Sequence, residues 1–122
     1  MMTNFKEKYG EVETPIFFIE KMFEMIPDKL FKNKKLKWLD IGCGNGAFSM
    51  YLFNILFKSL QDEIPEPNLR REHIIENMLY MVEVNKVCEL NLIYFFGNKA
   101  NIYIKDYLQD FHLPDMDIII GN

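Results

Sequence analysis

The chain has 122 residues, enough for one domain, and its 49% hydrophobic and 15% aromatic content provides ample core material. A net charge of −4 and a pI near 5.2 exclude a globally basic nucleic-acid footprint. The polar first residues and the lack of any apolar run approaching about 18 residues predict neither a signal peptide nor a membrane span.

The two cysteines, Cys43 and Cys88, do not have the spacing of metal ligands. We interpret both as reduced thiols, which are typical of an intracellular protein. The sequence therefore predicts a cytoplasmic protein with no bound metal.

The first predicted helix follows a threonine–proline pair. Thr14 can cap the helix, and Pro15 can occupy its first position, where a missing N–H is harmless. Pro27 ends the helical pattern. The apolar residues at helical spacing between them are Phe18, Ile19, Met22, Phe23 and Ile26.

Five lysines then lead into the first predicted strand. Phe31 is the only aromatic residue among them, so the run favours a solvated loop; a phosphate-binding patch is the alternative. The run consists of Lys29, Lys32, Lys34, Lys35 and Lys37.

A buried strand that runs directly into a glycine turn is the centre of the sequence. Trp38, Leu39 and Ile41 predict the strand, glycines follow at positions 42, 44 and 46, and a helical pattern runs from Ala47 to about residue 60. Glycine allows backbone angles that a Cβ forbids and a close approach of a ligand. The free N–H groups at the helix start predict an anionic or polar ligand group over residues 42–46, although a plain connecting turn is the alternative.

Strand and helix patterns alternate after this turn. We expect a loop over 61–68, a helix over 70–77, a strand over 78–84, a helix over 85–96, and strands over 101–105 and 115–120. The helix over 85–96 has an expected inner face of Val87, Leu90, Ile93 and Tyr94, and ends at Gly97. We interpret His73 as a surface or packing residue and assign no role to His112. This alternation predicts an α/β fold with a parallel sheet.

Glu83 stands at the carboxyl end of the apolar segment over 78–84. Ligands of open α/β sheets bind outside such strand ends, where a carboxylate can accept hydrogen bonds from both ribose hydroxyls. A nicotinamide cofactor is disfavoured, because Asp40 would face its pyrophosphate and Glu83 follows Gly46 by 37 residues instead of about 20. A carboxylate beside the loop instead suits a ligand with a positive centre.

The segment Leu-Asp-Ile-Gly-Cys-Gly-Asn-Gly, residues 39–46, closely resembles motif I of the S-adenosylmethionine (SAM)-dependent methyltransferases. The resemblance implies a Rossmann-like methyltransferase sheet. It also implies that SAM contacts Asp40, Gly42, Cys43, Gly44 and Gly46.

Further segments resemble motifs of the amino-methylating DNA methyltransferases. Gly10 with Thr14 and Pro15 resembles the motif that covers the methionine end of the cofactor, and residues 73–85 resemble the passage that ends in the ribose-binding acid, Glu83. By the same resemblance Asp106 accepts from the adenine amino group of the cofactor, and Tyr107 lies near the adenine face.

The end of the sequence, Ile-Ile-Ile-Gly-Asn, resembles the lead into the catalytic Asn-Pro-Pro-aromatic motif of that family. It implies that Asn122 accepts a hydrogen bond from the target amine, which belongs to a flipped base. The chain is thus identified as the N-terminal part, residues 1–122, of a restriction-modification adenine-N6 methyltransferase that is truncated at its catalytic motif. It would supply four strands of an incomplete sheet with the order 3-2-1-4-5.

We expect such a part to be inactive alone, to meet DNA through regions absent from this chain, and to need a complementary polypeptide at the open edge of its last strand. A glutamine-N5 protein methyltransferase and a non-catalytic SAM-binding or interaction module are the alternatives.

Overall fold

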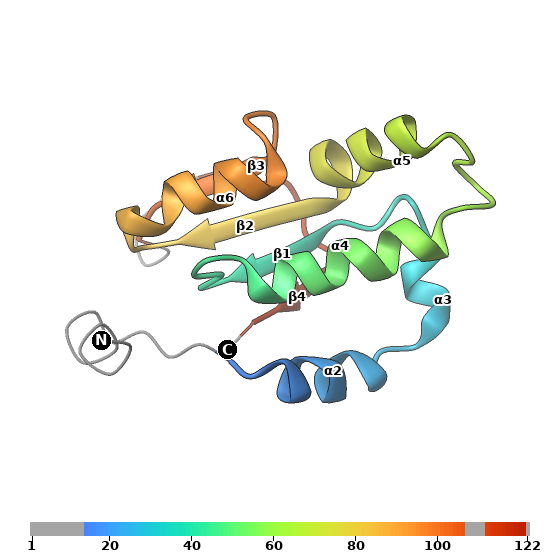
Figure 1. The fold of residues 1–122 in the computed structure, drawn as a ribbon, viewed down its shortest axis with the longest axis horizontal. Coiled ribbons are helices and arrows are strands. Elements are labelled where there is room, and N and C mark those ends of the chain that lie inside the picture. The colour runs from blue at the N-terminus through green and yellow to red at the C-terminus, as the bar shows by residue number, and fades with distance from the viewer. Residues whose placement is uncertain (1–13, 107–111, 122) are drawn as a thin grey trace.

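The computed structural model describes residues 14–106 and 112–121, in which helices and strands alternate (Figure 1). The strands are β1 (Trp38–Ile41), β2 (Leu79–Glu83), β3 (Asn101–Ile104) and β4 (Ile118–Ile120). The helices are α2 (Ile16–Glu24), α3 (Asp28–Phe31), α4 (Ala47–Ser59), α5 (Pro67–His73) and α6 (Glu89–Phe96). A π-helical turn, η1 (Ile74–Met78), precedes β2, and a 3₁₀ turn, η2 (Lys86–Cys88), precedes α6.

The four strands form one parallel sheet in the order β3–β2–β1–β4. Trp38 at the start of β1 pairs with Leu79 on one side and with Ile118 on the other. This arrangement confirms the predicted incomplete Rossmann-like α/β sheet. Because all four strands run the same way, the segments that follow β1, β2, β3 and β4 lie at the same edge of the sheet.

The helices pack on one face of the sheet. Trp38, Leu79 and Met81 of the strands share a core with side chains from α2, α3, α4 and α6, and the rings of Phe31 and Trp38 stack with centroids 5.3 Å apart. The helix side chains in this core include Ile19, Phe23, Phe48, Leu52, Leu56 and Leu92. Burial of these apolar side chains provides the main stabilisation of the fold.

The opposite face has a smaller core. Leu39, Tyr80 and Val82 are buried there, and the partly buried Leu113 and Met116 from the segment before β4 pack against them. β2 is therefore buried at every position, as its continuous apolar run predicted. In contrast, Ile119 on the edge strand β4 is 64% exposed.

The start of the first helix differs from the prediction by one residue. α2 begins at Ile16 with Pro15 as its N-cap residue, so Thr14 lies one position before the cap. The fixed extended conformation of Pro15 (φ −59°, ψ 144°) explains this, since its carbonyl accepts the N–H groups of Phe18 and Ile19.

The predicted inner face of α6 was wrong. Val87, Leu90 and Tyr94 are 58%, 78% and 82% exposed, whereas the buried side chains of this segment are Cys88, Leu92 and Phe96. Both sets have helical spacing, so periodicity could not choose between them. The sheet and the glycine turn decided the rotation, as described below. Gly97 ends the helix as predicted, with its N–H bonded to the carbonyl of Ile93.

The passage into β2 also differs from the expected single helix. α5 starts earlier, at Pro67, because the Glu66 side chain caps it by accepting from the N–H groups of Asn68 and Leu69. The π-turn η1 then leaves main-chain carbonyl groups that need a hydrogen-bond donor. The Asn101 amide does so by donating to the carbonyls of Ile75, Glu76 and Leu79 at 3.0–3.3 Å.

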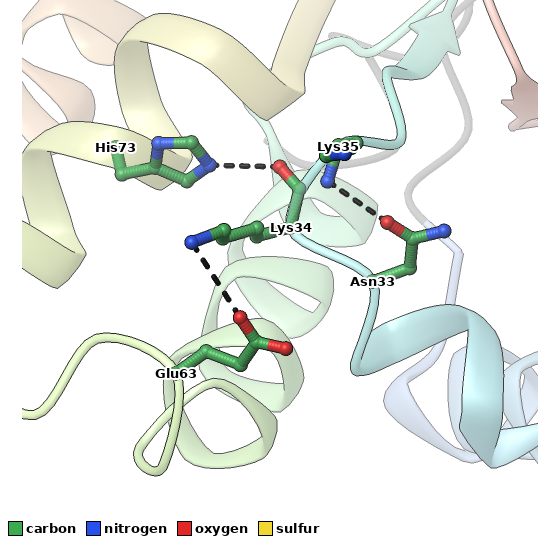
Figure 2. Close-up of polar contacts among 5 residues, drawn as sticks. All are labelled: Asn33, Lys34, Lys35, Glu63 and His73. Atoms are coloured by element: carbon green, nitrogen blue, oxygen red, sulfur yellow. Dashed lines mark hydrogen bonds and ion pairs between the residues drawn. The ribbon is translucent and has the colours of Figure 1, made fainter.

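His73 and the lysine run meet at the opposite end of β1 from the glycine turn. Figure 2 shows the His73 ring against the main-chain carbonyl of Lys34, with Nε2 and the oxygen 2.8 Å apart. The Lys34 ammonium pairs with Glu63 at 3.5 Å, and the Lys35 N–H donates to the Asn33 side chain. His73 is therefore a packing residue, and part of the lysine run has structural contacts of its own.

Candidate functional site

The glycine turn after β1 has the backbone that its sequence predicted. Gly42, Gly44 and Gly46 all have positive φ angles, of 68°, 55° and 92°. The N–H groups of Gly42 and Cys43 donate to the carbonyl of Val82 in β2, which fixes the turn against the neighbouring strand. The turn is partly open to solvent, since Gly42 and Ala47 are exposed. No side chain of the described residues caps the start of α4, so its first main-chain N–H groups begin beside this accessible part of the turn.

Gly46 also explains how α6 is oriented. It is buried, and a Cβ at this position would lie 3.0 Å from Leu92 and 3.1 Å from the ring of Phe96. Asn91 adds a side-chain hydrogen bond to Asn45 at 3.1 Å. The glycine turn and α6 are thus packed together, and this contact requires glycine at position 46.

Glu83 lies directly beside the turn. One carboxylate oxygen accepts from the N–H of Gly44 and the other from the N–H of Asn85, both at 2.8 Å. The side chain is only 5% exposed. Each carboxylate oxygen has further acceptor capacity, so these two bonds hold the group in place and leave lone pairs for hydroxyl donors.

Asp40 is fully buried beneath the start of α4. Its Oδ2 accepts from the Ser49 hydroxyl at 2.7 Å, and its Oδ1 has no hydrogen-bond partner among the described residues. Burial raises the pKa of Asp40 from 3.8 to about 7; hydrogen bonds from Ser49 oppose this rise, and the charge of Glu83 adds to it. A buried carboxyl oxygen without a donor marks a place where a cation or an N–H would be stabilised.

Gly121, at the end of β4, closes over this carboxyl group. Its φ is 123°, and a Cβ there would overlap the carbonyl oxygen of Ile41 and lie 3.2 Å from Asp40 Oδ1. The segment that leads to Asn122 therefore passes directly beside Asp40. The ends of β1, β2 and β4 bring Asp40, Glu83 and Gly121 to one edge of the sheet.

The remaining predicted site residues are Thr14, Cys43, Asp106, Tyr107 and Asn122. Cys43 is buried, and burial, with the charges of Asp40 and Glu83, raises the pKa of its thiol, so only its main chain could meet a ligand. Asp106 follows β3 at the same edge of the sheet and is partly exposed, as is Thr14 before α2. Tyr107 and Asn122 lie outside the described residues.

Two polar contacts of the site were missed in the sequence. Ser49 is a small polar residue in the first turn of a largely apolar helix, which is the signal that could have marked it as a partner of a strand residue. Asn85 both donates its N–H to Glu83 and caps η2 by accepting from the N–H of Val87. Among the described residues, no cluster of His, Cys, Asp and Glu could hold a metal ion.

Comparison with known proteins adds to this geometry. No family model matches the chain. It is 32% identical over 97 residues to the ribosomal RNA small subunit methyltransferase G of Malacoplasma penetrans, which covers 80% of this chain. It is also 32% identical over 83 residues, 66% of this chain, to an uncharacterized adenine-specific methylase of Mycoplasma pneumoniae.

The chain is similar to methyltransferases. The alignments span 38% and 20% of these two methyltransferases, so they relate the chain to a part of each. A Rossmann-like methyltransferase sheet with a glycine turn and a strand-end acid agrees with this similarity. In the described part of the chain, no helix is long and apolar enough to cross a membrane.

Proposed function

We propose that this chain is the SAM-binding part of a methyltransferase that modifies a nucleic-acid base, with the exocyclic N6 amine of adenine as the target. The observation that carries the proposal is the placement of Glu83 against the glycine turn, with both of its oxygens held by main-chain N–H groups. An accessible turn, the start of a helix and a fixed carboxylate form a suitable platform for a nucleoside ligand.

Each residue of the site has a role in this proposal. Glu83 accepts from the ribose hydroxyls, the main chain of Gly42 and Gly44 allows the ligand to approach closely, and Asp106 with Tyr107 contacts the adenine ring. Asp40 lies beneath the turn and in its ionised form would stabilise the positive end of the ligand, and Thr14 would contribute to that end. SAM supplies an electrophilic methyl group on a sulfonium when it is bound.

Asn122 is the proposed catalytic residue of the chain. Its side-chain oxygen would accept one hydrogen of the target amine and so direct the nitrogen lone pair, while binding brings the two reactants together. Gly121 supports this role by fixing the main chain immediately before Asn122, next to Asp40. The rest of the catalytic motif and the DNA-binding region would come from sequence outside this chain.

The similarity to a ribosomal RNA methyltransferase favours a second candidate substrate, because it covers the larger share of this chain. Incubation of the chain together with the sequence that completes its sheet, SAM and either adenine-containing DNA or small-subunit ribosomal RNA, followed by mass spectrometry of the nucleosides, distinguishes the two. N6-methyladenine in DNA supports the first candidate, and a methylated base in ribosomal RNA supports the second.

A complementary polypeptide is the proposed partner. β4 is an edge strand whose Ile119 is 64% exposed, and such an edge can pair with another strand. We expect the complete enzyme to require this partner and the chain alone to transfer no methyl group.

Calorimetric titration with S-adenosylhomocysteine tests the cofactor site without requiring catalysis. We expect binding by the unmodified chain and a loss of roughly tenfold or more in Glu83→Gln, which replaces one acceptor oxygen with a donor beside a main-chain N–H. Glu72→Gln, an equal charge change at an exposed position on α5, is the matched control. Equal affinity in both variants would refute the assignment of Glu83.

A further inference from the structure

A groove on the outer side of the helices contains two adjoining hollows of about 190 Å³ each. The first lies between α4, η1 and α6 and is lined mainly by Met50, Phe53, Ile75, Phe95 and Phe96. Both hollows share Arg71, Ile75 and Phe96. Neither includes Glu83 or a residue of the glycine turn, so the groove is separate from the candidate site described above.

The first hollow has a buried apolar floor and a partly exposed apolar rim. Ile75 and Phe96 are 5% and 4% exposed, whereas Met50 and Phe95 are 37% and 45% exposed. A cavity of about 150 Å³ can accept benzene, and sites for drug-sized ligands begin at about 300 Å³. The hollow therefore fits one aromatic ring with a short chain and is too small for a nucleoside cofactor.

Arg71 provides a cation at the junction of the two hollows. Its guanidinium carbon lies 5.7 Å from the centre of the Phe53 ring, and Nη2 donates to the carbonyl of Phe95 at 3.5 Å, the long limit of a hydrogen bond. Glu72, Glu76 and Lys99 also line the second hollow, but no carboxylate among the described residues forms an ion pair with Arg71. An arginine fork of this kind pairs well with a carboxylate ligand.

We propose that this groove binds a small organic acid with one aromatic ring and a carboxylate on a short chain. The ring lies in the first hollow over Ile75 and Phe96, and the carboxylate pairs with Arg71. The apolar floor and a guanidinium without an ion pair together select this class: a neutral aromatic compound gains no ion pair with Arg71, and a simple carboxylate leaves the floor uncovered.

A ligand bound in the groove would affect the glycine turn through its contact with Phe96. The ring of Phe96 lies 3.1 Å from the position that a Cβ would take on Gly46. A ligand that rests on one side of this ring therefore changes the surroundings of Gly46 on the other side. The amide signal of Gly46 is thus a reporter of binding that does not depend on the cofactor.

Titration of the ¹⁵N-labelled chain with 3-phenylpropanoate, followed by NMR, tests the proposal. We expect amide shifts at Ile75, Phe96 and Gly46, with a Kd on the order of 1 mM for a ligand of this size. The matched alcohol, 3-phenylpropan-1-ol, has the same ring and chain without the charge. It should bind several-fold more weakly, because it cannot form the ion pair.

Two exposed substitutions separate the charge from general effects. Arg71→Gln should weaken binding of the acid roughly 5- to 10-fold and leave binding of the alcohol unchanged. Lys58→Gln removes the same charge from an exposed α4 position that does not line the groove and should change neither.

Three results would overturn the proposal. The first is an absence of amide shifts with the acid. The second is equal affinity of the unmodified chain for the acid and the alcohol, or an affinity for the acid that Arg71→Gln leaves unchanged. The third is amide shifts at the groove that grow with protein concentration when no ligand is added. The last result would mean that a second copy of the chain occupies the groove.

Discussion

Substitution of the buried Asp40 by asparagine should change how stability depends on pH. The folded chain holds the proton of Asp40 up to about pH 7, whereas the unfolded chain releases it near 3.8. Between these values the folded state binds more protons than the unfolded state, so the free energy of unfolding falls as pH rises. The stabilising contribution of the protonated Asp40 is complete below pH 4 and is lost as pH passes 7.

The size of the effect follows from the two pKa values. Each unit of difference corresponds to 1.36 kcal/mol, so Asp40 alone should remove roughly 2–3 kcal/mol of stability between pH 5 and pH 7.5. Asp40→Asn keeps the shape of the side chain and cannot ionise in this range. The difference in unfolding free energy between the variant and the unmodified chain should therefore shift by this amount in favour of the variant.

Urea unfolding followed by the fluorescence of Trp38 is the assay. Trp38 is the single tryptophan and is fully buried, so its emission reports on the main core. Titrating groups that do not interact with Asp40 act equally on both proteins and cancel in the difference. Unfolding free energies that stay parallel from pH 5 to pH 7.5 would refute the reasoning, because they would mean that Asp40 ionises normally in the folded chain.

Three further substitutions test the packing of the site by the same assay. Gly121→Ala should lower the free energy of unfolding by roughly 2–4 kcal/mol, since a methyl group there overlaps a carbonyl of β1. Gly97→Ala, at a position with a positive φ but open space, should lower it by only about 1 kcal/mol. Equal losses of stability in the two variants would argue against the overlap. Asn101→Ala should cost about 1–3 kcal/mol because the carbonyls of Ile75, Glu76 and Leu79 lose their shared donor, and an unchanged stability would remove the proposed role of this amide. Ser49→Ala should move the pH midpoint of the stability change upward, since the hydrogen bond that lowers the pKa of Asp40 is lost; an unmoved midpoint would contradict that bond.

The strands and the glycine turn could be predicted because their signals are local. Alternating or continuous apolar runs with glycine punctuation define β1, β2 and the turn without knowledge of any partner. The rotation of α6 could not be predicted in this way, since Leu90 and Leu92 both belong to helical stripes. Close contact of Leu92 and Phe96 with Gly46, which is distant in sequence, selected one of these stripes.

The sequence by itself determined the α/β class and the position of the turn, since hydrophobic period and backbone freedom are properties of neighbouring residues. The strand order was expected only from the family resemblance, because it depends on pairing between distant segments. Only the tertiary structure decided the state of the two site acids. Glu83 is fixed by main-chain donors from two segments, and Asp40 is enclosed by α4 and by Gly121. Burial and hydrogen bonding set the chemistry of a carboxyl group, and both depend on residues that meet only when the sheet has formed.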